Sequence, residues 1–253
     1  MSQDKNQTLT GHLTELRNRL IYCVIALLLC FAACYYFADQ IYNFLLQPLQ
    51  KAIANGEKRM IYTSLLEGFL TYVKLSFTAA FFFAFPFIAA QFYLFLAPAL
   101  YKKEKKFTLR LLFYCPFLFF LGASMVYFMV MPMAFEFFLS FENLNPQNGL
   151  PIELEAKISE YLSLITWLIF AFGIAFQMPL LIICLVKFGL ISVQTLQQKR
   201  KYWIVIIFAI AAIITPPDIL SQFALALPMM ALYEMAILAC LKINKKTKND
   251  WRN

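Results

Sequence analysis

Two acidic side chains are the clearest candidates for chemistry in this sequence, because each stands in a basic stretch beside a long apolar segment. Glu15 lies in HLTELRNRL (residues 12–20), and Glu104 lies in APALYKKEKK (residues 97–106) among four lysines. A stretch that only had to remain hydrated would not need a carboxylate. The simplest interpretation is a local ion pair, either of Glu15 with Arg19 at i,i+4 spacing or of Glu104 with its lysine neighbours. Recognition of a cationic partner is the alternative.

The sequence contains no pattern typical of an enzyme or of a metal site. Its single histidine is His12, and it has no HExxH, GxSxG or Walker pattern. The six cysteines lie within apolar segments, and none has the CxxC spacing of a zinc site or a redox motif. We therefore expect a protein that is not an enzyme and that binds no metal and no cofactor.

The composition requires that most of the chain is embedded in lipid. Of the 253 residues, 62% are hydrophobic and only 14% are charged, whereas a soluble domain has about 45–50% apolar and about 25% charged residues. The net charge of +8 is distributed over the gaps between apolar segments. This distribution argues against a nucleic-acid-binding face.

Six apolar segments are predicted to cross a membrane as helices. A hydrocarbon core of about 30 Å requires about 20 helical residues. The predicted spans cover residues 20–38, 72–97, 111–135, 161–186, 202–215 and 221–241. The fifth has only 14 residues, and the proline pair after it predicts a tight turn into the sixth. We predict an all-α, polytopic membrane domain over residues 1–253, with both termini on the same side.

The basic residues indicate the orientation of these spans. The N-terminal arm, the loops at 98–110 and 187–201 and the C-terminal tail hold 17 lysines and arginines, and the opposite side holds four. By the positive-inside rule, the side with 17 faces the cytoplasm. Most acids show the reverse bias, so Glu15 and Glu104 are unusual on that side.

A small-solute or ion transporter is an alternative function for this layout. Such a protein needs charged side chains near the bilayer centre. The predicted spans supply only Glu234, with Lys74 and Asp218 near span ends, and no internal repeat is visible. The transporter hypothesis is therefore weaker than that of a receptor or scaffold.

Four stretches of the chain resemble the TatC family, the multi-spanning subunits of the twin-arginine (Sec-independent) protein translocase. They are HLTELRNRL before the first span, FLAPALYKKEKK after the second, AFGIAFQMP in the fourth and TPPDILSQ between the last two. The resemblance covers essentially the whole chain. It implies a concave, glove-like shell of six helices in the inner (cytoplasmic) membrane, and export of folded proteins driven by the proton-motive force.

The resemblance also implies a cytoplasmic binding site for signal peptides that carry an arginine pair. The implied site residues are Leu13, Glu15, Arg17, Phe95, Lys103 and Glu104. A guanidinium can bond a carboxylate through two parallel hydrogen bonds, and the ammonium group of lysine cannot. Leucines recur at helical spacing in residues 12–20, so we expect this segment to lie along the membrane interface before it turns into the first span.

The partners implied by the resemblance are TatA- and TatB-type single-span proteins, other copies of the chain and the lipid bilayer. Polar residues in or near the spans are candidates for contact with partner helices, namely Gln177, Asp218, Gln222 and Glu234. For Gln177 a helix–helix hydrogen bond is an equally good interpretation, and for Glu234 so is a polar partner within the bundle.

Prolines are predicted to shape several of the helices. The resemblance places Pro48 and Phe69, with Glu67 and Gly68, in an extracytoplasmic cap, and we expect them to have a structural role there. Four of the prolines within the spans are expected to kink or interrupt their helices, although membrane helices can also simply tolerate proline; these are Pro86, Pro116, Pro132 and Pro179.

Overall fold

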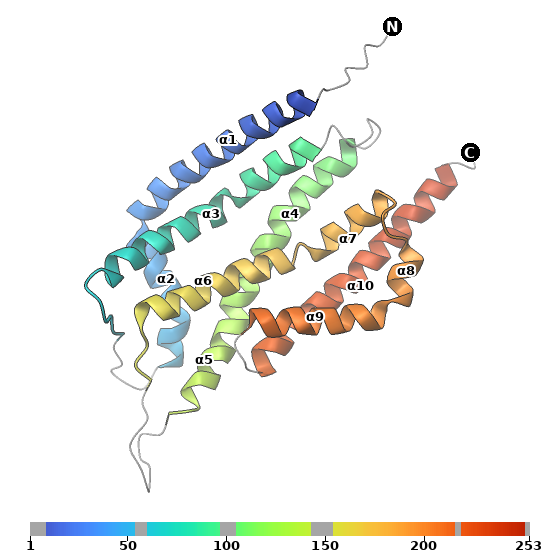
Figure 1. The fold of residues 1–253 in the computed structure, drawn as a ribbon. Coiled ribbons are helices and arrows are strands. Elements are labelled where there is room, and N and C mark those ends of the chain that lie inside the picture. Colours follow the sequence, from blue (N-terminus) through green and yellow to red (C-terminus); the bar gives the residue numbers. More distant parts are fainter. Residues whose placement is uncertain (1–8, 54–59, 97–104, 143–153, 216–218, 251–253) are drawn as a thin grey trace. The chain divides into compact units, whose positions relative to one another are not determined.

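The computed structural model describes residues 9–53, 60–96, 105–142, 154–215 and 219–250, and their regular structure is helical apart from one isolated bridge, Ile61 with Lys157. The helices are α1 (Leu9–Tyr36), α2 (Ala38–Ala52), α3 (Glu67–Leu96), α4 (Lys105–Met125), the π-helical η3 (Val126–Val130), α5 (Met131–Leu139), α6 (Ile158–Ala175), α7 (Met178–Lys187), α8 (Val193–Gln198), α9 (Arg200–Ile214) and α10 (Ile219–Asp250) (Figure 1).

Five stretches in the described part of the chain are long and apolar enough to cross a membrane. They are Leu13–Tyr36, Glu67–Phe95, Leu112–Leu139, Ile158–Lys187 and Ser221–Lys242. Helix α9 is the sixth apolar helix, and its 15 residues correspond to about 22 Å at helical rise. These helices confirm the predicted all-α, six-span layout, including its short fifth member.

The chain forms two compact units. One consists of residues 1–42 and 69–116, and the other of residues 43–68 and 117–253. In the first unit α1 and α3 lie side by side (Figure 1), with the rings of Phe31 and Phe77 6.4 Å apart. The rings of Tyr42 and Tyr72 stack at 5.7 Å.

Helix α1 contradicts one prediction. Residues 12–20 do not turn before the first span but belong to a single helix that continues to Tyr36 (Figure 1). The helix contains no proline, and its one glycine, Gly11, lies in its first turn. Nothing in this stretch therefore interrupts the backbone hydrogen bonds that a sharp turn would have to break.

The second unit has a core of large apolar side chains. Its most deeply buried members are Phe119, Val126, Val130, Met131, Ile165, Leu168, Phe172, Leu196, Ile207, Leu225, Met229 and Ile237. Helix α10 packs against α7 and α9. The short α9 ends against α6, because the indole N–H of Trp167 donates a 3.1 Å hydrogen bond to the carbonyl of Ile214.

Of the four prolines expected to kink or interrupt their helices, two interrupt them. Pro132 and Pro179 lie in the first turn of α5 and α7. Each lacks the N–H that would continue the preceding helix, and η3 and the break at residues 176–177 precede them. In contrast, α3 and α4 continue through Pro86 and Pro116.

Two glycines allow α4 and α6 to approach closely within the second unit. A Cβ atom on Gly122 would lie 2.8 Å from the carbonyl oxygen of Phe172, and one on Gly173 would lie 2.5 Å from the ring of Phe119. Both phenylalanines are fully buried. The small residues thus set the distance between the helices, as is common in membrane helix pairs.

Pro48 leaves one carbonyl of α2 without its helical hydrogen-bond donor, and a side chain from another helix supplies the donor instead. Proline has no N–H, so the carbonyl of Phe44, four residues earlier, loses its helical donor. The hydroxyl of Tyr127 in η3 donates to this carbonyl at 2.9 Å, and the rings of Phe44 and Tyr127 stack at 4.4 Å. The hydroxyl of Tyr161 in α6 donates to the next carbonyl, that of Leu45, at 2.8 Å.

This arrangement predicts that the cost of Tyr127→Phe depends on Pro48. In the native chain the substitution strands a carbonyl and is expected to lower the free energy of unfolding by about 1 kcal/mol. In a Pro48→Ala background the cost should nearly vanish, because alanine supplies the missing backbone N–H. A double-mutant cycle of unfolding in detergent measures this coupling, and equal costs in both backgrounds would contradict the assignment.

Glu67, the first residue of α3, connects three segments of the second unit. Its carboxylate accepts hydrogen bonds from Ser159 Oγ at 2.5 Å and from the backbone N–H of Thr63 at 2.8 Å. Lys157 Nζ lies 3.8 Å away. Among the residues expected in the cap, Pro48 is buried and Phe69 is exposed; their role in a cap remains a prediction.

Candidate functional site

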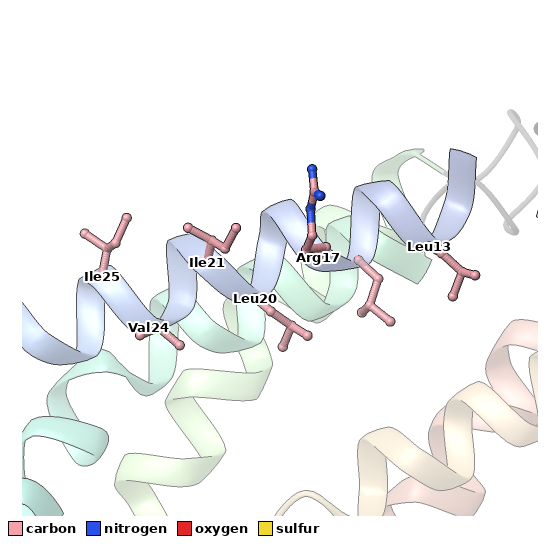
Figure 2. A pocket seen from close by; sticks show the side chains of 7 residues that line it. Leu13, Arg17, Leu20, Ile21, Val24 and Ile25 are labelled. Atoms are coloured by element: carbon pink, nitrogen blue, oxygen red, sulfur yellow. The ribbon is translucent and has the colours of Figure 1, made fainter. Parts of the chain in front are cut away.

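Helix α1 presents one face of its N-terminal half as an open, mostly apolar surface. The residues that line it recur at spacings of three and four, and they are Leu13, Leu16, Arg17, Leu20, Ile21, Val24 and Ile25. Figure 2 shows Arg17 projecting from the same side of the helix as Ile21 and Ile25. Leu13 is 64% exposed. Two residues of the predicted signal site, Leu13 and Arg17, are therefore accessible on one helix.

Glu15 lies on the same helix and is held by Arg19. The Nε and Nη2 atoms of Arg19 donate hydrogen bonds of 3.0 and 2.6 Å, both to Oε1 of Glu15. The Glu15 side chain is 26% exposed and that of Arg19 is 22% exposed. The local i,i+4 ion pair expected from the sequence is confirmed.

Arg19 also connects α1 to α3. Its Nη1 donates a 3.2 Å hydrogen bond to Oε1 of Gln91, so a single guanidinium bonds the acid of one helix and the amide of the other. Gln91 lies four residues before Phe95, which is half-buried. Because residues four apart share one face of a helix, this bond brings the α1 acid and the Phe95 face of α3 into the same region.

Sequence reasoning missed Gln91. A signal was available, because this glutamine is the only amide or charged side chain in residues 79–96. A lone amide in an apolar helix usually bonds to another helix. Its partner could not be inferred, since Arg19 is 72 positions away.

Three predicted site residues lie outside the described part of the chain. Lys103 and Glu104 precede the first described residue of α4, and Asp218 precedes that of α10. Their participation in a site rests on the sequence.

Gln177 lies at the break between α6 and α7. Its Nε2 donates a 3.3 Å hydrogen bond to the carbonyl of Gly173, one turn earlier, and its backbone N–H donates to Ile174. The side chain thus stabilises the last turn of α6, where Pro179 ends the regular pattern. Contact of Gln177 with a partner helix remains a prediction.

Two of the predicted candidates, Gln222 and Glu234, lie in α10, and both bond to α9. Gln222 Nε2 donates a 3.3 Å hydrogen bond to the carbonyl of Phe208. Glu234 pairs with Arg200 Nη2 at 2.9 Å. Because Arg200 is the first residue of α9, this pair joins the start of α9 to the middle of α10. Glu234 thus has a polar partner on a neighbouring helix, but both side chains are about half exposed, so the pair does not lie inside the bundle. Contact of Glu234 with a partner helix remains a prediction.

Comparisons with known proteins agree with this layout. The family model described as "Sec-independent protein translocase protein (TatC)" matches residues 11–228. A protein of that name from Rickettsia prowazekii (strain Madrid E) is 51% identical over 229 residues, which cover 90% of each chain. Another, from Escherichia coli (strain K12), is 38% identical over 237 residues, which cover 94% of this chain and 89% of that one.

A solved structure gives the same result at the level of the fold. The crystal structure of the twin-arginine translocase receptor TatC in the detergent DDM superposes with a TM-score of 0.75 and 38% sequence identity. The superposition covers 90% of this chain and 98% of the solved one.

Proposed function

Because the chain belongs to the TatC family of Sec-independent protein translocase proteins, we propose that it acts as the receptor that binds twin-arginine signal peptides. The chain is a multi-pass membrane protein of this translocase. We assign the binding site to the cytoplasmic ends of α1 and α3 and to the loop that follows α3.

The observation that carries this proposal is the connection of Glu15 to the Phe95 face of α3 through Arg19 and Gln91. It supports a single site built from two helices. Glu15 is partly exposed, so an incoming side chain can reach it. Glu104 and Lys103 follow Phe95 closely in sequence and supply the second carboxylate and a basic flank.

The chemistry of recognition follows from these two carboxylates. Each guanidinium of an arginine pair presents parallel N–H donors that match a carboxylate, whereas an ammonium is a hydrated point charge. The lysines that flank Glu104 in the sequence repel basic segments that lack the matching geometry. Arg17 and Leu13, exposed on α1, contact the residues that flank the pair.

The remaining assignments extend this proposal to the assembled machine. The protein acts in the inner membrane with TatA- and TatB-type single-span partners and with other copies of itself, and it uses the proton-motive force rather than catalytic chemistry of its own. Partner helices contact the α9–α10 pair and the fourth span. The residues at these contacts are Gln177, Asp218, Gln222 and Glu234.

Photocrosslinking tests the location of the site. A photoreactive residue at position 13, 95 or 104 is expected to crosslink to a signal peptide with an arginine pair and not to the same peptide with a lysine pair. A probe at Phe128, which is 75% exposed on η3, is the control and should not label. Equal labelling by both peptides, or labelling only at the control, would refute the assignment.

A further inference from the structure

The Arg19 guanidinium contacts only one of the two carboxylate oxygens of Glu15. Two of its three nitrogens, Nε and Nη2, donate to Oε1, and no described residue donates a hydrogen bond to Oε2. The third donor, Nη1, is fixed by Gln91 at 3.2 Å. The Arg19 side chain is only 22% exposed, and its guanidinium is bonded to both Glu15 and Gln91. The Glu15 carboxylate is therefore oriented by a cation with a fixed position.

We propose that Arg19, anchored by Gln91, is the specificity-determining residue of this site, because it cancels the charge of Glu15 and leaves Oε2 to a directional hydrogen-bond donor. This inference rests on the proposed function. Arg19 acts through Glu15, so it is a positioning residue and does not itself bind the signal peptide.

Charge cancellation favours arginine over lysine for a physical reason. A bare carboxylate attracts any cation, and Coulomb attraction depends little on the shape of the cation. When Arg19 already neutralises Glu15, most of this attraction is lost to an incoming charge. What remains is the hydrogen bond to Oε2, for which a planar guanidinium is pre-organised and an ammonium is not.

Gln91 contributes by keeping Arg19 in this geometry. An unanchored arginine regains the rotamer freedom of its long side chain, and it would then move away from Glu15 for part of the time. The hydrogen bond from Nη1 to Gln91 opposes this motion. Loss of Gln91 should therefore relax specificity in the same direction as loss of Arg19.

The experiment measures competition by arginine-pair and lysine-pair signal peptides for the full-length protein in detergent. In Arg19→Gln, binding of the lysine-pair peptide is expected to strengthen, and the arginine-to-lysine affinity ratio to fall by about tenfold, the value of one hydrogen bond to a charged group. Gln91→Met should lower the same ratio by a smaller factor. This second variant keeps the test usable if Arg19→Gln does not fold.

Two further variants separate specificity from packing. Phe77→Ala removes the ring contact with Phe31 between the same two helices and should leave the ratio unchanged. In a Glu15→Gln background, Arg19→Gln should no longer alter the ratio, because the acid through which Arg19 acts is gone.

The outcomes distinguish this inference from the proposed function. Suppose that Glu15→Gln weakens binding of the arginine-pair peptide but Arg19→Gln and Gln91→Met leave the arginine-to-lysine affinity ratio unchanged. The proposed role of Arg19 would then be refuted, and the assignment of Glu15 to the site would remain. A lower affinity ratio in Phe77→Ala would also refute this role, because it would show that specificity depends on the packing of α1 against α3 and not on Arg19 itself. If Glu15→Gln has no effect on either peptide, the assignment of Glu15 to the site fails, and the role of Arg19 fails with it.

Discussion

Replacing both Glu15 and Glu104 by glutamine is expected to weaken binding of a twin-arginine signal peptide by at least about 100-fold. Removing one partner of a desolvated, hydrogen-bonded charge pair costs about 2–5 kcal/mol, and each acid is assigned to one guanidinium. Glutamine keeps the size of the side chain and one acceptor oxygen but loses the negative charge of the carboxylate. Peptide binding to the purified protein, and export of a folded twin-arginine substrate in cells, are the measurements.

A matched control is available on the side of the membrane predicted to face away from the cytoplasm. Glu160 is an acid in the first turn of α6, and Glu160→Gln should leave binding unchanged. The double variant should insert into the membrane in normal amounts, because a neutral amide is less costly near the bilayer than a charged carboxylate. Export at the wild-type rate by the Glu15→Gln, Glu104→Gln protein would overturn the receptor assignment.

Gly122→Leu is expected to be the most destabilising single substitution at the contact between α4 and α6. The Cβ atom of the leucine alone would lie 2.8 Å from the Phe172 carbonyl oxygen. This oxygen belongs to a helix backbone, which cannot move aside locally as the end of a side chain can. Overpacking of this kind typically costs about 1–3 kcal/mol, and leucine adds further carbons to the clash. We expect a loss of about 3 kcal/mol in the free energy of unfolding, measured in detergent, at the upper end of that range.

Gly68 provides the comparison for this prediction. It lies in the first turn of α3, and a Cβ there would meet no atom within 4 Å. Gly68→Ala should leave stability unchanged or slightly raise it, since alanine favours helix more than glycine does. Equal stability of the Gly122→Leu and wild-type proteins would show that the two helices can separate without cost.

The apolar spans were predictable because hydropathy acts over whole segments. The short fifth span was also predictable, since Pro216 and Pro217 limit it in the sequence. Helix α2 was not predicted, because its 15 residues mix polar and apolar positions and no long apolar run marks it. The continuity of α1 was missed for a related reason: a change from polar to apolar composition was interpreted as a change of direction, although the backbone contains no helix breaker there.

The candidate site was predictable only in part. Glu15 and Phe95 stand in stretches that resemble a known family, and the Glu15–Arg19 pair follows from i,i+4 spacing alone. The Arg19–Gln91 bond joins residues 72 positions apart, and the Arg200–Glu234 pair joins residues 34 apart. Local spacing holds no information on such partners, because they depend on which faces of two helices meet.

The unbroken course of α1 has a mechanical consequence. Its 28 residues form a rod of about 42 Å, with Glu15 near one end and the Phe31 contact with α3 towards the other. A hinge at residue 20 would absorb any pull exerted on Glu15. A continuous helix is expected to move as one body, so a displacement of Glu15 would be carried to the Phe31–Phe77 contact near its other end.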